Sequence, residues 1–319
     1  MTAIIRGGVV DGIECRRDVD GIPRADSAGD YSVVNAATVV SKRAPKTLVC
    51  PAGGLMLPSL PELWRYRSVL FVLIWLNVTY RYRQTFLVPL WFVLSPLVRM
   101  VAISLLLGGI ARLPSDGVPY PIFTYAALLP WELFASGVSR STKCFVSYHH
   151  IISKVYFPRM LLPTAEVCTA LVDFALSFGI LHGMMAFYGF AFTPRLLIVP
   201  VLLVLTLALA LGIGLWLGGA QARFRDVSNF VSYLVQFWFF GTPLAYAAGV
   251  LTDRLPTTLK TLFLLNPMNG VVEGFRWALL DTGRPPDALF AMSAGLVVLM
   301  LFLGSIVFLR TEQSIVDLV

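Results

Sequence analysis

Charged side chains are scarce in this chain. They make up 13% of its 319 residues, whereas hydrophobic residues make up 57%, and soluble domains carry about 25% charged residues. Two segments, Leu196 to Ala222 and Ala288 to Leu309, contain no charge at all. Each is longer than the roughly 20 residues that cross a hydrocarbon core, and the mean hydropathy is +0.76. This composition excludes a water-soluble protein and predicts an integral membrane protein.

The chain also lacks the motifs of common enzyme classes. It contains no GxSxG, no HExxH and no pair of carboxylates at helical spacing in a water-accessible loop. No lysine follows a glycine, so a phosphate-binding Gly-Lys loop is missing. We therefore predict no catalytic residue, no enzyme activity and no cofactor in this chain, and any ATP would be hydrolysed by another chain.

Cysteine and histidine are too few and too dispersed for a metal site. The four cysteines, Cys15, Cys50, Cys144 and Cys168, have no CxxC or zinc-ligand spacing. His149 and His150 are adjacent, so they cannot share a helical face as ligands at i and i+4 would. Neither a metal site nor a disulfide is predicted.

Acidic residues are outnumbered, and the formal net charge is +7. The basic residues cluster between apolar segments rather than on one soluble face, and no tract combines them with aromatic residues as a nucleic-acid platform does. We therefore predict no nucleic-acid partner. Positive charge in a membrane protein is typical of cytoplasmic loops.

The first part of the chain, residues 1–58, differs from the rest. It is rich in Gly, Asp, Arg, Ser and Ala, and it has neither a sustained helical or strand period nor the apolar run of a signal peptide. This composition predicts a disordered or loosely structured cytoplasmic extension.

An amphipathic helix is predicted over residues 59–84. Ser59 and Glu62 form a capping box at its start, and its apolar run, Val69 to Val78, is ten residues long. At about 1.5 Å a residue, this run is too short to cross a bilayer. Four arginines flank it, which favours a helix lying in the membrane interface over a short first span.

Six further apolar segments are long enough to cross the membrane. Their approximate bounds are 86–110, 120–142, 160–190, 196–220, 227–250 and 288–309. With the N-terminus inside, the cytoplasmic side receives Arg65, Arg67, Arg81, Arg83, Lys143, Lys154, Arg159, Arg223, Arg225 and Arg310. The opposite loops receive Arg112, Arg195, Arg254, Lys260, Arg276 and Arg284. The sequence thus predicts an all-α membrane domain over 59–319 with both termini in the cytoplasm.

Two short apolar segments lie between the last two predicted spans. Leu255 to Leu265 and Gly270 to Leu280 are each too short to cross, and Asn266-Pro267 separates them. They predict a re-entrant helical hairpin that dips into the outer leaflet. Irregular backbone at membrane depth is tolerated only where it is buried in protein or faces a cavity, so a role at a pore follows.

Few ionisable residues lie inside the predicted spans. They are Arg99, Glu132, Arg140, Glu166, Asp173 and His182. Each is either functional or paired between spans, because an isolated charge is unfavourable in lipid. A proton relay needs carboxylates that face one cavity, and from sequence these residues are scattered over three spans at different depths. A proton-coupled transporter is therefore disfavoured.

The fifth predicted span is dense in aromatic residues. Tyr233, Phe237 and Phe240, and less closely Tyr246, can share one helical face. Aromatic rings stack on the apolar faces of sugars, so this face is a candidate pore lining. Ordinary helix packing with an interfacial aromatic belt explains the same pattern equally well.

Several local signatures resemble the ABC-2 family of exporter permeases, in the branch that exports O-antigen, capsule, teichoic acid or galactan. They are Arg81 to Thr85, Ile152 to Arg159, Arg223 to Val227, Thr242-Pro243, Asn266 to Met268, Phe275-Arg276 and the tail Phe308 to Asp317. In the tail, Ile315 and Val316 depart from the usual Phe-Ala of the family. The resemblance covers roughly Ser59 to Val319.

The resemblance implies a homodimeric six-span permease that binds two copies of a separate ATP-binding subunit, which holds ATP and Mg. The substrate would be a lipid-linked polysaccharide, and the location the bacterial cytoplasmic membrane. The implied functional residues are Lys154, Val155, Tyr156, Phe157, Pro158 and Arg159 in coupling to the ATPase, Arg81, Tyr82 and Arg83 in the interface helix, Arg223, Arg225 and Asp226 in a cytoplasmic loop, and Asn266, Pro267, Phe275 and Arg276 at an outer gate. Apart from the resemblance, the aromatic face of the fifth span leads us to predict that Tyr233, Phe237 and Phe240 line the pore.

Other functions remain open at this point. An ABC-2 exporter of drugs or small lipids shares the expected fold. A membrane-embedded glycosyl- or acyltransferase belongs to a different class, and it would need a catalytic carboxylate or histidine near a loop and would act without an ATPase.

Overall fold

The computed structural model describes residues 64–83, 87–148, 157–191, 193–224, 226–246, 256, 263, 265–283 and 285–318. These residues all belong to one unit of the chain, Ala52–Val319. The predicted extension 1–58 lies outside them, as does most of the first half of the predicted hairpin.

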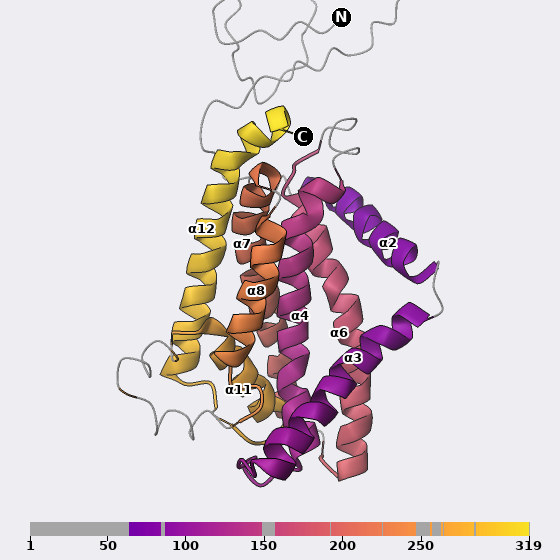
Figure 1. Ribbon diagram of the computed structural model, residues 1–319, viewed down its shortest axis with the longest axis vertical. Coiled ribbons are helices and arrows are strands. Elements are labelled where there is room, and N and C mark those ends of the chain that lie inside the picture. The colour runs from indigo at the N-terminus through magenta and orange to yellow at the C-terminus, as the bar shows by residue number, and fades with distance from the viewer. Residues whose placement is uncertain are drawn as a thin grey trace, which may run out of the picture. The chain divides into compact units, whose positions relative to one another are not determined.

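Every regular element in the described part of the chain is helical (Figure 1). The elements are α2 (Arg67–Arg83), α3 (Leu87–Ile103), the π-helix η1 (Ser104–Ile110), α4 (Tyr120–Ser147), α6 (Leu161–Tyr188), the 3₁₀-helix η2 (Pro194–Ile198), α7 (Val199–Arg223), α8 (Val227–Phe240), α11 (Pro267–Leu280) and α12 (Ala288–Leu318). An α-helix therefore lies in each of the predicted spans, and the expectation of an all-α protein is confirmed.

Three helical segments are long and apolar enough to cross a membrane: Leu161–Tyr188, Pro194–Gln221 and Ala288–Thr311. Large apolar side chains also remain exposed around the helices, with Phe187 85% and Phe237 76% exposed. Water-soluble proteins rarely expose so much apolar surface, whereas lipid accommodates it. The chain is a multi-pass membrane protein, and the number of six spans stays a prediction.

Helix α4 forms the centre of the fold. It packs against α6 and α7 over long stretches and also contacts α3, α8 and α11, and Figure 1 shows it between α8 and α6. Most of its first half is fully buried, including Phe123, Tyr125 and Trp131. Two charged residues of α4, Glu132 and Arg140, pair with residues of α3 and α6.

Helices α7 and α12 approach each other closely through glycine. A Cβ atom added at Gly212 would lie 2.7 Å from the Cα of Leu301, and one added at Gly304 would collide with the Gly212 backbone. Small residues let membrane helices pack backbone to backbone and gain dispersion energy. This contact fixes the last helix of the chain against the core.

Helix α8 is shorter than the predicted span 227–250, because its helical backbone ends at Phe240. Gly241 and Pro243 follow, and proline cannot continue the hydrogen-bond ladder. The Thr242 hydroxyl instead donates to the Trp238 carbonyl at 3.0 Å. Tyr246 lies beyond this turn in irregular backbone, so its inclusion on the helical face of Tyr233 was wrong.

Candidate functional site

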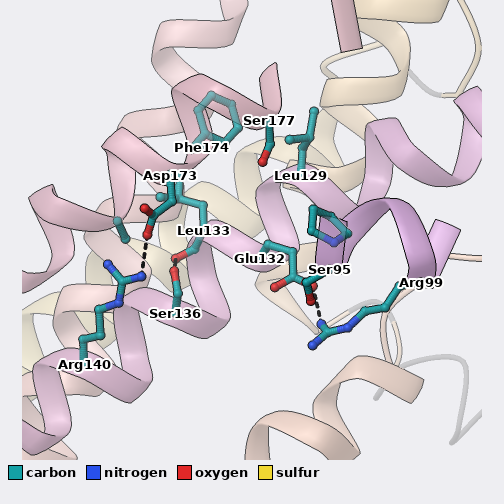
Figure 2. A pocket seen from close by; sticks show the side chains of 12 residues that line it. Ser95, Arg99, Leu129, Glu132, Leu133, Ser136, Arg140, Asp173, Phe174 and Ser177 are labelled. Carbon is teal, nitrogen blue, oxygen red and sulfur yellow. Dashed lines mark hydrogen bonds and ion pairs between the residues drawn. The ribbon is translucent and has the colours of Figure 1, made fainter. Parts of the chain in front are cut away.

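Two cavities lie on either side of one face of α4. The smaller, of about 230 Å³, lies between α3, α4 and α6 (Figure 2). It is lined by Ser95, Pro96, Arg99, Leu129, Glu132, Leu133, Ser136, Arg140, Ala170, Asp173, Phe174 and Ser177. Four of these lining residues are charged, which is unusual for a cavity inside a bundle of membrane helices.

The larger cavity, of about 640 Å³, lies between α3, α4 and α8. It is lined by Arg99, Ala102, Ile103, Trp131, Glu132, Ala135, Ser136, Ser139, Ser232, Val235, Gln236, Phe239 and Phe240. The two cavities share Arg99, Glu132 and Ser136. Its volume falls within the usual range for small-molecule sites, about 300–1,000 Å³.

An ion pair joins Arg99 of α3 and Glu132 of α4, as Figure 2 shows. Both residues line both cavities. The guanidinium of Arg99 donates to the carboxylate of Glu132. The side chain of Arg99 is 50% exposed and that of Glu132 is 29% exposed. The pair therefore remains accessible from the cavities instead of being packed away.

A second cluster of charges connects three helices. Asp173 of α6 accepts hydrogen bonds from Arg140 of α4 and, at 3.0 Å, from Arg81 of α2. The side chains of Arg140 and Asp173 are only 14% and 12% exposed. Two guanidinium groups thus bind the carboxylate of Asp173. It also ties the end of the predicted interface helix to the bundle.

A third group of side chains, Asn77, Tyr148 and Glu166, connects α2, the end of α4 and α6. The Glu166 carboxylate of α6 accepts hydrogen bonds from the Tyr148 hydroxyl at 2.8 Å and from the Asn77 amide of α2 at 3.3 Å. Burial, followed by the negative charge of Glu166, raises the pKa of Tyr148. The phenol therefore stays protonated as a donor at physiological pH.

Four of the six ionisable residues within the predicted spans lie together rather than scattered, which corrects the interpretation from sequence. Arg99, Glu132, Arg140 and Asp173 line one cavity as two pairs. Since each carboxylate is paired with arginine, pairing between helices explains their presence at this depth. Two carboxylates do face one cavity, so their scatter is no longer a reason to disfavour a proton relay.

The residues predicted to line the pore share the exposed face of α8. Tyr233 is 64%, Phe237 76% and Phe240 70% exposed. Phe240 also lines the larger cavity. The three rings are thus largely exposed within the described part of the chain, and their assignment to a pore stays a prediction.

Asn266, a residue of the predicted gate, joins the ends of α8 and α11. Its side-chain oxygen accepts from the Trp238 indole at 2.8 Å and from the Met268 backbone at 3.0 Å, capping α11. Its side-chain nitrogen donates to the Gly241 carbonyl and to the Thr242 hydroxyl, both at 3.0 Å. Pro267 follows at the first helical position, where proline is favoured.

The other predicted gate residues, Phe275 and Arg276, are fully buried. The Arg276 guanidinium donates to the carbonyls of Leu244 and Tyr246 at 2.9 and 3.2 Å. It also lies 3.7 Å from the centre of the Phe123 ring of α4. These contacts fasten α11 to α4 and to the segment after α8. The second half of the predicted hairpin is therefore a packed helix, and its re-entry stays a prediction.

The predicted coupling segment is described only from Phe157 onward, and Lys154, Val155 and Tyr156 lie outside the described residues. Phe157 is 7% exposed and packs with Leu73 of α2 in the chain's own core. Direct contact of this ring with a partner would need it to move. Pro158 and Arg159 are half-buried before α6, and the role of the segment in coupling stays a prediction.

The remaining predicted positions lie at helix ends. Arg223, in the last turn of α7, and Asp226, just before α8, are exposed, whereas Arg225 lies outside the described residues. Tyr82 and Arg83 end α2, where the structure describes the backbone but not their side chains.

Sequence reasoning missed the polar and aromatic residues that surround the Arg99–Glu132 pair. They include Trp131, Ser136, Ser232 and Gln236. One signal could have found part of the set: Glu132, Ser136 and Arg140 are spaced four residues apart, which places them on one helical face. Which helices face this polar row depends on packing and could not be read from one segment.

Comparison with known proteins supplies the family. The family model described as ABC-2 type transporter matches residues 68–280. The chain is 32% identical over 255 residues to the O-antigen export system permease protein RfbA of Myxococcus xanthus, a match that covers 79% of this chain and 96% of that protein. Two RfbA permease proteins of Klebsiella pneumoniae are 26% and 24% identical, over 61% of this chain and 74% of each relative. The chain belongs to the ABC-2 type transporter family.

Proposed function

We propose that this chain is the transmembrane permease subunit of an ABC transporter that exports a lipid-linked polysaccharide across the cytoplasmic membrane. The observation that carries the proposal is the similarity to the Myxococcus protein, which extends over 96% of a protein named as an O-antigen export permease. The long apolar helices support the same role.

The transporter would be a homodimer of this chain with two copies of an ATP-binding subunit, and both termini would be cytoplasmic. ATP and Mg would bind to that subunit, since this chain has no Gly-Lys phosphate loop. Closure of the ATP-binding subunits would push the segment Lys154 to Arg159 and shift the membrane helices as rigid bodies.

The arginines near α2 are suited to the anionic head of a lipid-linked substrate. Arg81 and Arg140 both lie beside Asp173, and guanidinium groups bind phosphate with paired hydrogen bonds. The glycan would then pass the aromatic face of α8. The Asn266 and Arg276 contacts would hold the outer end of the passage.

Export can be tested in a bacterium that carries this gene. Deletion should abolish surface polysaccharide, detected with an impermeant label, while lipid-linked polymer accumulates inside. Expression of the chain together with its ATP-binding subunit should restore both levels, and a partner with an inactivated phosphate loop should not. Unchanged surface polysaccharide after deletion would contradict the proposal.

A further inference from the structure

Flat aromatic rings form one wall of the larger cavity. The rings of Trp131 and Phe239 meet edge to face with their centres 5.7 Å apart, and Phe240 lies 5.6 Å from Phe239. Trp131 is almost fully buried, whereas Phe240 is 70% exposed. The wall therefore runs from the core of the bundle to its surface. Trp131 supports the wall from inside the bundle, whereas the half-buried Phe239 and the exposed Phe240 offer apolar faces on which the C–H face of a sugar can stack.

Hydrogen-bonding groups also line the same cavity. Arg99 and Glu132 present a guanidinium and a carboxylate, and Ser136, Ser232 and Gln236 add neutral groups. Because Arg99 and Glu132 form an ion pair, their charges cancel. The cavity thus combines aromatic faces with many donors and acceptors and carries no net charge.

The Arg99–Glu132 pair is more exposed than the Arg140–Asp173 pair, which suggests that it does more than stabilise the helix packing. The side chains of Arg140 and Asp173 are 14% and 12% exposed, whereas those of Arg99 and Glu132 are 50% and 29% exposed. If the Arg99–Glu132 pair only neutralised charge at membrane depth, we would expect it to be buried like the Arg140–Asp173 pair. The Arg99–Glu132 pair instead keeps hydrogen-bonding capacity directed at a cavity.

We propose that this cavity binds an uncharged sugar unit of the exported glycan, with Glu132 accepting from sugar hydroxyls and Arg99 donating to sugar oxygens. The inference rests on the proposed function and adds a location and a substrate preference. An anionic unit would gain little in a cavity whose charges cancel. A neutral polyhydroxy ring satisfies both the donors and the acceptors while stacking on the aromatic wall.

Cysteine protection tests this site in the complex with the ATP-binding subunit, in a chain whose four native cysteines are replaced. Ser232→Cys reports on the cavity, and Ser147→Cys is the matched control. Both hydroxyls are exposed and donate to the carbonyl four residues earlier, but Ser147 lies outside the cavity lining. A water-soluble maleimide is applied to membranes from cells that make the lipid-linked glycan and from cells blocked in its synthesis.

We expect the glycan to slow labelling at position 232 and to leave labelling at position 147 unchanged. Glu132→Gln should weaken this protection by about tenfold, which corresponds to one hydrogen bond to a charged group. Equal labelling at position 232 with and without glycan, or none in either membrane, would overturn the inference. Surface polysaccharide measured in the same cells shows separately whether the proposed export function holds.

Swapping the two charged residues tests whether the Arg99–Glu132 pair recognises sugar or only neutralises charge. The double variant Arg99→Glu with Glu132→Arg keeps an ion pair at the same position but reverses the donors and acceptors. If the pair binds sugar in a fixed orientation, protection at position 232 should stay weakened as in Glu132→Gln. Full protection in the double variant would show that the pair only cancels charge, which also overturns the inference.

Discussion

Asn266 uses both ends of its amide to hold two helices together. Its oxygen accepts from Trp238 and Met268, and its nitrogen donates to Gly241 and Thr242. Few side chains other than asparagine can serve two donors and two acceptors in so little space. The Asn-Pro pair seen in the sequence is thus explained by capping of α11 as well as by the break before it.

We expect Asn266→Asp to destabilise the protein by about 1–3 kcal/mol, because the carboxylate keeps the two accepted bonds but loses both donated ones. Thermal unfolding of the purified complex in detergent measures the change. Thr242→Val, which removes only one of the Asn266 partners, should have a smaller effect. An aspartate variant as stable as the wild type would show that these bonds do not hold the joint.

Asp173 is the acidic centre between α2, α4 and α6. Asp173→Ala should destabilise the protein by about 3 kcal/mol, because it removes the carboxylate that Arg81 and Arg140 share in a mostly buried setting. Asp173→Asn keeps the shape but not the charge and should lose a similar amount. If the asparagine variant unfolds at the wild-type temperature, shape rather than charge is what this position needs.

At the scale of elements, α7 is the helix whose packing depends most directly on small residues. Gly212 faces the backbone of α12, and Gly214 faces Ser141 of α4. Two faces of one helix therefore have to remain free of side chains. This explains why glycine, which normally weakens a helix, recurs in an apolar helix of this kind.

Gly212→Ala should destabilise the protein by about 1–3 kcal/mol, since its Cβ would lie 2.7 Å from Leu301 and force α12 away. Gly179→Ala in α6 is the control, because a Cβ there meets nothing within 4 Å. The control should be neutral or stabilising by up to about 1 kcal/mol. Detergent unfolding temperatures of the two variants compare them; equal effects would argue against close packing of α7 on α12.

At the scale of the whole molecule, transport and ATP hydrolysis are carried out by different chains of the proposed transporter. The permease supplies the helices, the cavities and their charges, and the ATP-binding subunit supplies the energy. The charge clusters on α2, α4 and α6 connect the predicted interface helix to the central helix. A force applied near α2 would therefore reach the walls of the smaller cavity directly.

The purified chain alone should hydrolyse no ATP above background, because it has no Gly-Lys phosphate loop. The complex with the ATP-binding subunit should hydrolyse ATP, and an inactivated phosphate loop in that subunit should remove the activity. Phosphate release measured in detergent or in liposomes checks both. Sustained hydrolysis by the isolated chain would contradict the division of roles.

The sequence alone determined that this is a helical membrane protein, and it located the helices closely. Both depend on local properties: uncharged runs set where lipid is favourable, and a local signal such as Asn266-Pro267 sets where α11 begins. The motifs also sufficed for the family. The end of α8 at Phe240 was missed because an apolar sequence continues past Gly241 and Pro243, two residues that disfavour a continuing helix.

Only the tertiary structure decided which charges meet. Arg99 forms an ion pair with Glu132, and Arg140 with Asp173, because α3 and α6 pack against α4. It also decided that Phe157 and Arg276 are buried. Periodicity gives the faces of a single helix but not which face of a neighbour it meets, since that choice depends on side-chain shape and close packing across the whole bundle.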